Sequence, residues 1–284
     1  MPPEDGGGPA LGRIVELGLQ VLAPVTALTG VLYYFGYIRY QEFFAHFGVD
    51  LTSAGITRAG FVVGSARVAF GPLAAALLVA LAALAGHYAL TPRLTRAGGR
   101  PLAALGACAL VLAAVAGAGL VGLPLGTALL PPAALIGAAL LAGYLSHLAG
   151  RRGVPEPLRE TFDRTRTARI VLLTATLTVA VFWAVSTYAR ERGREAAEAF
   201  ERSLPLQARA VVYSRERLFI TGPGVEVQQL TGPGAKYGYR YSGLRVLTHT
   251  ADRWLLVPPV WDPGTSTVVV LPDMAEEIRV DLAP

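Results

Sequence analysis

Long apolar stretches separated by short polar segments fill the first two thirds of the chain, and their length is the strongest signal in the sequence. A helix needs about 20 apolar residues to cross a bilayer core about 30 Å thick. Each stretch is close to that length, so the pattern predicts an α-helical membrane bundle with about five transmembrane helices. The stretches run approximately over Ile14–Ile38, Val68–Leu90, Leu102–Leu123, Leu125–Leu148 and Ile170–Ala189.

The fourth stretch is the least regular, because Pro131 and Pro132 fall within it. Proline lacks an amide hydrogen and disrupts a helix interior, so we expect regular helix to start there and 124–130 to form an irregular turn. Two interpretations of 102–148 stay open. It forms either two full crossings or a re-entrant hairpin that the other helices shield from lipid. Both return the chain to the same side of the membrane.

After the fifth stretch the pattern changes twice. Opposite charges at i, i+4 spacing, Arg194–Glu198 and Glu198–Arg202, predict a short charged helix that Pro205 ends. From residue 206 onward, short runs of alternating apolar residues between Gly and Pro turns predict a small all-β domain, a sandwich or a barrel. The candidate strands are Gln207–Tyr213, Arg217–Thr221, Val225–Leu230, Tyr239–Thr248, Trp254–Val257, Thr267–Leu271 and Ile278–Leu282.

These patterns divide the chain into four parts. We expect a disordered Pro- and Gly-rich N-terminus at 1–13, a transmembrane domain at 14–189, a helical stalk at 190–205 and an extracytoplasmic β-domain at 206–284. The β-domain has its own apolar strand residues and two tryptophans, so we expect it to fold without the membrane part.

The polar loop after the first stretch bears on that expectation. Phe43, Phe44 and Phe47 share one face of a predicted helix within Arg39–Gly60. That face either lies flat on the outer membrane surface or packs against the C-terminal domain, and both interpretations stay open. If the β-domain fails to fold alone, we expect either this loop or a partner to complete its core.

Arginine supplies nearly all of the positive charge, and its distribution predicts the orientation. By parity, the N-terminus and the loops 91–101 and 149–169 share one side, and these loops hold most of the arginines near helix ends. We therefore expect a multi-pass protein of a bacterial plasma membrane, with a cytoplasmic N-terminus and the C-terminal domain outside. Five arginines are expected to contact lipid headgroups at the cytoplasmic face: Arg93, Arg96, Arg100, Arg151 and Arg152.

Residues that could carry chemistry are few. No Asp or Glu occurs between Leu51 and Pro155, which argues against transport coupled through buried carboxylates. His87 and His147 lie near the cytoplasmic ends of their helices and could share a metal, but no third ligand is near them, so we expect interfacial packing. The single cysteine, Cys108, is expected to be a small packing residue. The motifs of serine hydrolases, P-loops and dinucleotide folds are absent from the sequence, so we expect no catalytic, cofactor-binding or metal-binding residue.

The expected partners follow from the same features. The first partner is the lipid bilayer. The second is another envelope protein or a second copy of the chain, which would contact small-residue helix faces such as Ala138/Ala142. Nucleic acid is not expected, because no dense basic cluster lies on a soluble element beside aromatic residues.

Two segments resemble a known group of proteins. They are Leu32-Tyr-Tyr-Phe-Gly-Tyr-Ile-Arg39 followed by Phe47-Gly-Val-Asp50, and Tyr239-Arg-Tyr-Ser-Gly-Leu-Arg-Val246 followed by a Trp-Leu-Leu-Val-Pro strand from 254. In these segments the chain resembles an uncharacterised group of actinobacterial multi-pass membrane proteins with a small C-terminal β-domain. The resemblance implies a bacterial envelope location and brings no catalytic residue with it.

Three hypotheses for function follow. The leading one is a non-enzymatic membrane protein that presents a small extracytoplasmic β-domain for binding or envelope scaffolding, because a stalk and a β-domain occur without a catalytic constellation. The second is a component of a channel or transporter, which the polar-poor helices disfavour for a sole subunit. The third is a membrane-embedded enzyme acting on lipid through His87, His147 and the loop arginines.

Overall fold

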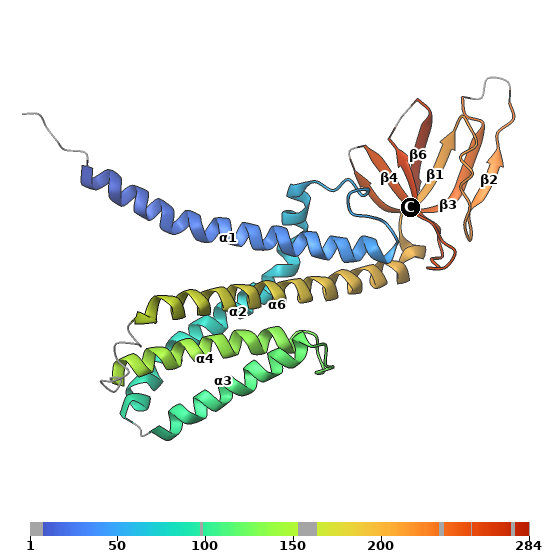
Figure 1. The fold of residues 1–284 in the computed structure, drawn as a ribbon. Helices are drawn as coiled ribbons and strands as arrows, with labels where there is room; N and C mark the ends of the chain where they lie inside the picture. Colours follow the sequence, from blue (N-terminus) through green and yellow to red (C-terminus); the bar gives the residue numbers. More distant parts are fainter. Residues whose placement is uncertain are drawn as a thin grey trace, which may run out of the picture. The chain divides into compact units, whose positions relative to one another are not determined.

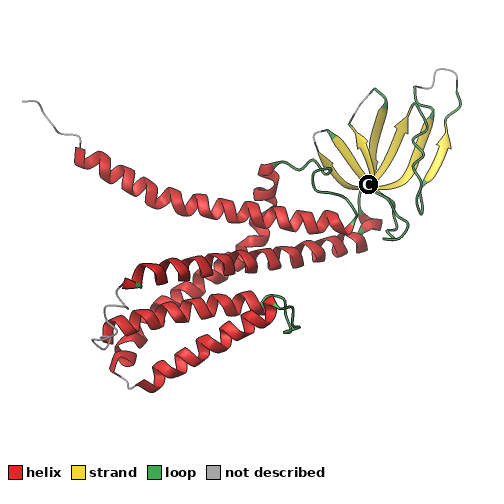
Figure 2. Ribbon diagram, viewed as in Figure 1, coloured by secondary structure: helices red, strands yellow, loops and turns green. Residues whose placement is uncertain are grey.

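The computed structural model describes residues 8–96, 99–152, 164–232, 236–250, 252–273 and 276–283. Long helices come first and a small antiparallel β-domain follows (Figures 1 and 2), so the predicted fold class is confirmed. The helices are α1 (Gly8–His46), α2 (Arg58–Arg96), α3 (Gly99–Leu120), α4 (Leu130–Arg152) and α6 (Arg166–Arg202).

Four of the described helices, α2, α3, α4 and α6, are long and apolar enough to cross a membrane. Only 6% of the residues in the apolar windows of α2 and α3 are buried inside the protein, so their apolar side chains face outward. A surface of this kind is compatible with a membrane protein, because a bilayer would cover it.

Helix α1 contains the first predicted stretch. It begins at Gly8, inside the 1–13 segment that was expected to be disordered, and residues 1–7 lie outside the described residues. Pro9 sits in its first turn, where a missing amide hydrogen costs nothing.

Helices α3 and α4 lie side by side as a hairpin, joined by the irregular segment 121–129. Each is long enough for a full crossing. Pro131 and Pro132 lie in the first turn of α4, which agrees with the expectation that regular helix starts there. Small residues bring the two helices close together. Ala116 and Ala134 are buried, and a Cβ atom on Gly119 would collide with the ring of Pro131.

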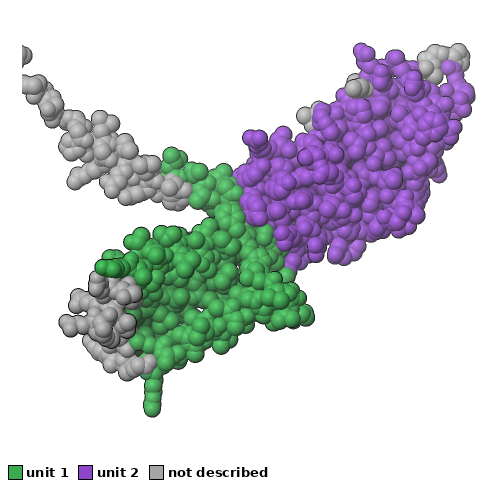
Figure 3. All heavy atoms as spheres, viewed as in Figure 1, with its two compact units in different colours: residues 1–31, 66–188 green, residues 32–65, 189–284 purple. Residues whose placement is uncertain are grey.

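The chain forms two compact units (Figure 3). Unit 1 comprises residues 1–31 and 66–188, and unit 2 comprises residues 32–65 and 189–284. Unit 2 is therefore larger than the 206–284 segment that the sequence suggested as a domain. It also contains the last turns of α1, the loop that follows, the first turns of α2 and the last turns of α6. The expected 190–205 stalk is the continuation of α6, followed by a short 3-10 helix, η1 (Leu204–Leu206).

The strands of unit 2 form one antiparallel sheet in the order β5-β4-β3-β1-β6, with β2 also paired to β3. The arrangement differs from the sandwich or barrel suggested by the sequence. It has a single layer, and among the described residues no pairing of β5 with β6 closes it. The strands are β1 (Arg209–Ser214), β2 (Glu226–Gln229), β3 (Tyr239–Thr250), β4 (Arg253–Val257), β5 (Val269–Pro272) and β6 (Ile278–Ala283).

Each of these strands overlaps a predicted strand, but the prediction of a strand at Arg217–Thr221 is wrong. The amide of Leu218 donates a hydrogen bond to Oη of Tyr241 at 2.7 Å, so a side chain satisfies it instead of a neighbouring strand. Phe219 then adopts a φ of 52°, which a strand residue does not adopt. The segment is a loop that lets Ile220 enter the core.

Strand β4 is buried on both faces of the sheet, and its neighbouring residues show this directly. Leu256 belongs to a cluster with Ala210, Val212, Tyr241 and Leu244 on one face. Its neighbours Leu255 and Val257 point to the opposite face, where helical residues cover them. We call this second cluster the helix–sheet core. Its buried members are Phe44, Phe47, Val49, Leu51, Ala54, Phe61, Ala197, Leu204, Leu247, Leu255 and Val257.

Candidate functional site

Aromatic rings from three parts of unit 2 meet in the helix–sheet core. The ring of Phe47, at the end of α1, lies 5.8 Å from that of Phe200 on α6 and 5.1 Å from that of Trp261 in the β4–β5 loop. Phe43 lies 5.8 Å from Phe200 as well. Of the two interpretations of the phenylalanine face, packing against the C-terminal domain is therefore correct. Phe44 and Phe47 are each 2% exposed, so this contact excludes water.

Helices α1 and α6 approach each other closely at Gly193. A Cβ atom at that position would lie 2.5 Å from the carbonyl oxygen of Arg39 and 2.8 Å from Cβ of Glu42. Ion pairs flank the contact. The carboxylate of Glu42 lies 3.2 Å from Nε of Arg194, and Nε2 of His46 lies 2.6 Å from the carboxylate of Glu201. The absence of a side chain at Gly193 lets the two backbones pack together.

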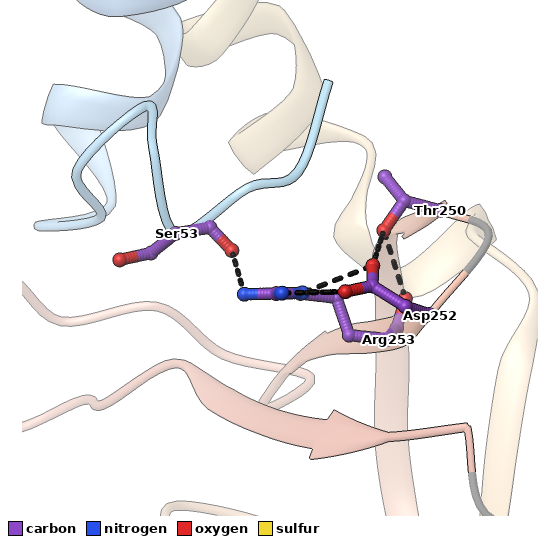
Figure 4. Close-up of polar contacts among 4 residues, drawn as sticks. All are labelled: Ser53, Thr250, Asp252 and Arg253. Atoms are coloured by element: carbon purple, nitrogen blue, oxygen red, sulfur yellow. Dashed lines mark hydrogen bonds and ion pairs between the residues drawn. The ribbon is translucent and has the colours of Figure 1, made fainter. Parts of the chain in front are cut away.

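The loop between α1 and α2 is tied to the β3–β4 hairpin by one arginine (Figure 4). Nη1 of Arg253 donates to the carbonyl oxygen of Ser53 at 3.3 Å, and Nε of Arg253 donates to the carboxylate of Asp252 at 3.1 Å. Thr250 Oγ1 donates to the same carboxylate at 3.3 Å. The hydrogen bond from Arg253 holds the pKa of Asp252 below its usual value, and the same contact raises the pKa of Arg253.

A pocket opens where these helix ends meet the sheet, with a volume of about 530 Å³. We call it the junction pocket. Aromatic rings form much of its wall, and Thr57, Thr248 and Thr250 add hydroxyl groups. Nε of Arg39 is buried and has no hydrogen-bond partner in the part of the chain that the structure describes. Arg39 also lines the pocket, and a guanidinium beside an apolar wall can bind an anionic group of a ligand. The ring-bearing residues of the wall are Tyr40, Phe43, Phe44, Phe200 and His249.

The arginines predicted to contact lipid headgroups lie at helix ends in unit 1. Arg93 and Arg96 are in the last turn of α2, Arg100 is in the first turn of α3, and Arg151 and Arg152 end α4. Figure 1 shows these helix ends at the same end of unit 1. The side chains of Arg93, Arg100 and Arg151 are exposed. Contact of these side chains with lipid stays a prediction.

The structure brings the two predicted histidines together. The rings of His87 and His147 are 5.4 Å apart. Thr91 Oγ1 lies 3.3 Å from Nδ1 of His87 and 3.1 Å from the hydroxyl of Tyr144, so the histidines belong to a small polar network. Among the described residues, no group of three or more His, Cys, Asp or Glu side chains could hold a metal.

Sequence reasoning missed Thr91, although its position four residues after His87 on one helix was the available signal. It missed Arg39 for a different reason, because only the fold shows that this arginine reaches a pocket with the sheet behind it. Cys108, which was expected to be a small packing residue, is exposed on α3.

Comparison of the chain with known protein families, curated proteins and solved structures finds no match.

Proposed function

We propose that this chain is a non-enzymatic integral membrane protein that presents its β-domain outside a bacterial plasma membrane as a binding module. The N-terminus would then be cytoplasmic, as the arginine distribution favours. The junction pocket is the observation that carries the proposal. Helix α1, the loop after it, α6 and strand β3 all contribute to its wall, so the pocket exists only where the helix ends meet the sheet.

The chemistry of the pocket suggests the class of ligand. Its volume of about 530 Å³ falls within the usual range for small-ligand sites, roughly 300–1,000 Å³. Aromatic rings favour an apolar or flat body, and the guanidinium of Arg39 in the pocket wall favours an anionic group. Scaffolding through another envelope protein remains within the proposal if that partner inserts such a group into the pocket.

The first experiment tests orientation with single cysteines in a Cys108→Ala background. Ser266→Cys should react with a membrane-impermeant maleimide on intact protoplasts, whereas Thr165→Cys should react only after the membrane is opened. The reverse labelling would place the β-domain in the cytoplasm and remove the proposal.

The second experiment tests binding at the junction pocket. Thr248→Cys lies in the pocket wall and keeps nearly the volume of threonine, while Ser266→Cys lies in the β4–β5 loop outside the pocket lining. If a ligand fills the pocket in cells, the Thr248→Cys thiol should react several-fold more slowly in intact protoplasts than in purified protein. The Ser266→Cys thiol should react equally in both. Equal rates for both variants would show an empty pocket and contradict a binding role.

A further inference from the structure

Strand β6 forms one edge of the sheet, and no strand among the described residues pairs with its outer side. Its pairing with β1 is continuous over six residues, and neither a proline nor a register shift interrupts it. The edge strands β2 and β5 are only four residues long, and β5 ends in Pro272. Short strands, prolines and bulges usually protect an edge, because an open edge can pair with another strand. The β6 edge is therefore the one best suited to receive a further strand.

The backbone groups that face this open edge follow from one hydrogen bond. The amide of Arg215 donates to the carbonyl oxygen of Glu277 at 3.3 Å, so the backbone of Glu277 faces β1. Hydrogen-bonding groups alternate in direction along an antiparallel strand. The backbone groups of Arg279 and Asp281 therefore face β1 as well. Those that point outward belong to Ile278, Val280 and Leu282.

The side chains at this edge carry one charge of each sign. Arg279 and Asp281 point to the same face of the sheet, and Nε of Arg279 lies 2.8 Å from the carboxylate of Asp281. The two charges balance, but the positive group precedes the negative one along the strand. A second copy that runs antiparallel presents the opposite order, so unlike charges meet. On the other face Leu282 is 56% exposed, and a neighbouring strand would cover it.

We propose that the outer edge of β6 pairs with β6 of a second copy of this chain, antiparallel and centred on Val280, so that the two sheets join into one. In this register Val280 lies opposite its own copy, and Ile278 lies opposite Leu282 of the second copy. Outward backbone groups then meet, and each of these residue pairs exchanges two hydrogen bonds. Arg279 lies opposite Asp281 of the second copy at a non-hydrogen-bonded position, where Cα atoms are only about 4.5 Å apart and side chains are closest.

Other registers fit less well. A displacement by one residue would set outward backbone groups opposite inward ones and remove the hydrogen bonds. Centring the pairing on Arg279 would set this arginine opposite its own copy and Asp281 opposite Glu277. Centring it on Asp281 would set two aspartates opposite each other. Like charges directly opposite each other are destabilising, so the order of the charges selects the register centred on Val280.

The symmetry of this pairing suits two chains in one membrane. Antiparallel strands of equal sequence are related by a two-fold axis perpendicular to the sheet, so equivalent faces of the two sheets lie on the same side. The helix-covered face, with Leu255 and Val257, therefore lies on the same side in both copies. The ends of α1 and α6 that belong to unit 2 approach the joined sheet from that side in each copy. The pairing does not depend on the junction pocket or on any ligand bound there.

Disulfide cross-linking of the full-length protein tests the register. Arg279→Cys and Asp281→Cys are made separately in a Cys108→Ala background, carry different tags and are reconstituted together in phosphatidylcholine vesicles. In the mixed dimer the two thiols lie opposite each other, while the second pair keeps its arginine and its aspartate. Either variant alone places its two thiols diagonally, about 7–8 Å apart, which a disulfide does not bridge without backbone movement. A mild oxidant should therefore cross-link the mixture about tenfold faster than either variant alone.

The matched control uses another edge of the same sheet. Glu226→Cys and Gln228→Cys on β2 have the same spacing and are both exposed. Their mixture should cross-link no faster than either variant alone, which measures random collisions in the vesicle. Equal rates for the mixed and separate β6 variants would overturn the proposed register.

Charge variants test the recognition, with energy transfer between copies labelled at the N-terminus as the measure of pairing. Arg279→Asp alone and Asp281→Arg alone should each stay monomeric, because like charges would face each other. An equimolar mixture of the two should pair again, and so should the double variant Arg279→Asp/Asp281→Arg. This recovery separates loss of pairing from loss of folding, and its absence would contradict the charge order. A monomeric wild type would overturn the proposal and leave the edge to a strand of a different protein.

Discussion

The helix–sheet core makes a quantitative prediction about the fragment 206–284. In the whole chain, Leu247 is 7% exposed, and Leu255 and Val257 are fully buried. Most of the residues that cover them precede residue 206, including Phe44, Phe47 and Leu204. A fragment without these residues would expose one entire face of β4.

The cost of this exposure follows from the burial of the three side chains. Burying a leucine or valine contributes about 1.5–3 kcal/mol, so the fragment would lose about 5–9 kcal/mol. Small domains have a total stability of about 5–15 kcal/mol, with those near 80 residues at the lower end. The fragment would also lose the hydrogen bond that Nε of Arg245 donates to the carbonyl oxygen of Leu204 at 3.0 Å.

We therefore predict that the isolated fragment 206–284 gives a non-cooperative thermal transition and poorly dispersed amide resonances. The matched control is unit 2 as one chain, with residues 32–65 joined to 189–284 through a flexible Gly–Ser linker. The control should melt cooperatively, because it contains the whole helix–sheet core. A cooperative melt of the fragment alone would refute this reasoning and would support the independent β-domain that the sequence suggested.

Three other predictions concern single features of the fold. Gly193→Ala should destabilise unit 2 by about 1–3 kcal/mol, because the new methyl group would meet the backbone of Arg39. Gly117→Ala should be neutral or slightly stabilising, because a methyl group at that position would enter open space. Denaturant titration of both variants measures these changes in the free energy of unfolding. Arg253→Gln should speed amide hydrogen exchange in 50–56 at neutral pH, because the link to Ser53 is lost. The pKa of Asp252 is lower in the folded protein than in the unfolded chain. The contribution of its carboxylate to stability is therefore complete above the unfolded-state pKa of about 3.9, and it is lost as the pH falls through the lower folded-state pKa. Acid should therefore lower the protection factors of the same segment, which are corrected for the intrinsic exchange rate at each pH, in the wild type but change them little in Arg253→Gln. Replacing the five predicted headgroup arginines together by glutamine should give mixed orientation in a reporter-fusion assay, and an unchanged topology would show that charge does not set it.

Hydropathy predicted the long helices well because twenty apolar residues in a row have few alternatives to a membrane-length helix. It also placed the start of α4 correctly, since proline in a first turn is a local effect. Strand prediction failed at Arg217–Thr221, where a hydrogen bond to Tyr241 more than twenty residues away decides the conformation. No local pattern contains that information.

The functional features were harder to predict for the same reason. The junction pocket joins Arg39 to residues of β3, which are about two hundred positions later in the chain. The groove between α4 and α6 joins Arg151 to Arg166 and Arg169, which all fall within the single loop 149–169 predicted from the sequence. In each case the residue types were visible, but the side chains that share a pocket depend on how helices pair.

The two units differ in the side chains at their helix contacts, and a lipid environment around unit 1 would explain the difference. In unit 1 the contact between α3 and α4 relies on Ala116, Gly119 and Ala134. Lipid tails are as apolar as leucine, so large side chains gain little by leaving lipid, and close backbone approach supplies the attraction. In unit 2 large rings such as Phe44 and Phe47 add to the close backbone approach at Gly193. These gain the full hydrophobic effect only if water would otherwise surround them. The aromatic end of α1 therefore belongs with the β-sheet by its chemistry, although it is continuous with a helix of membrane length.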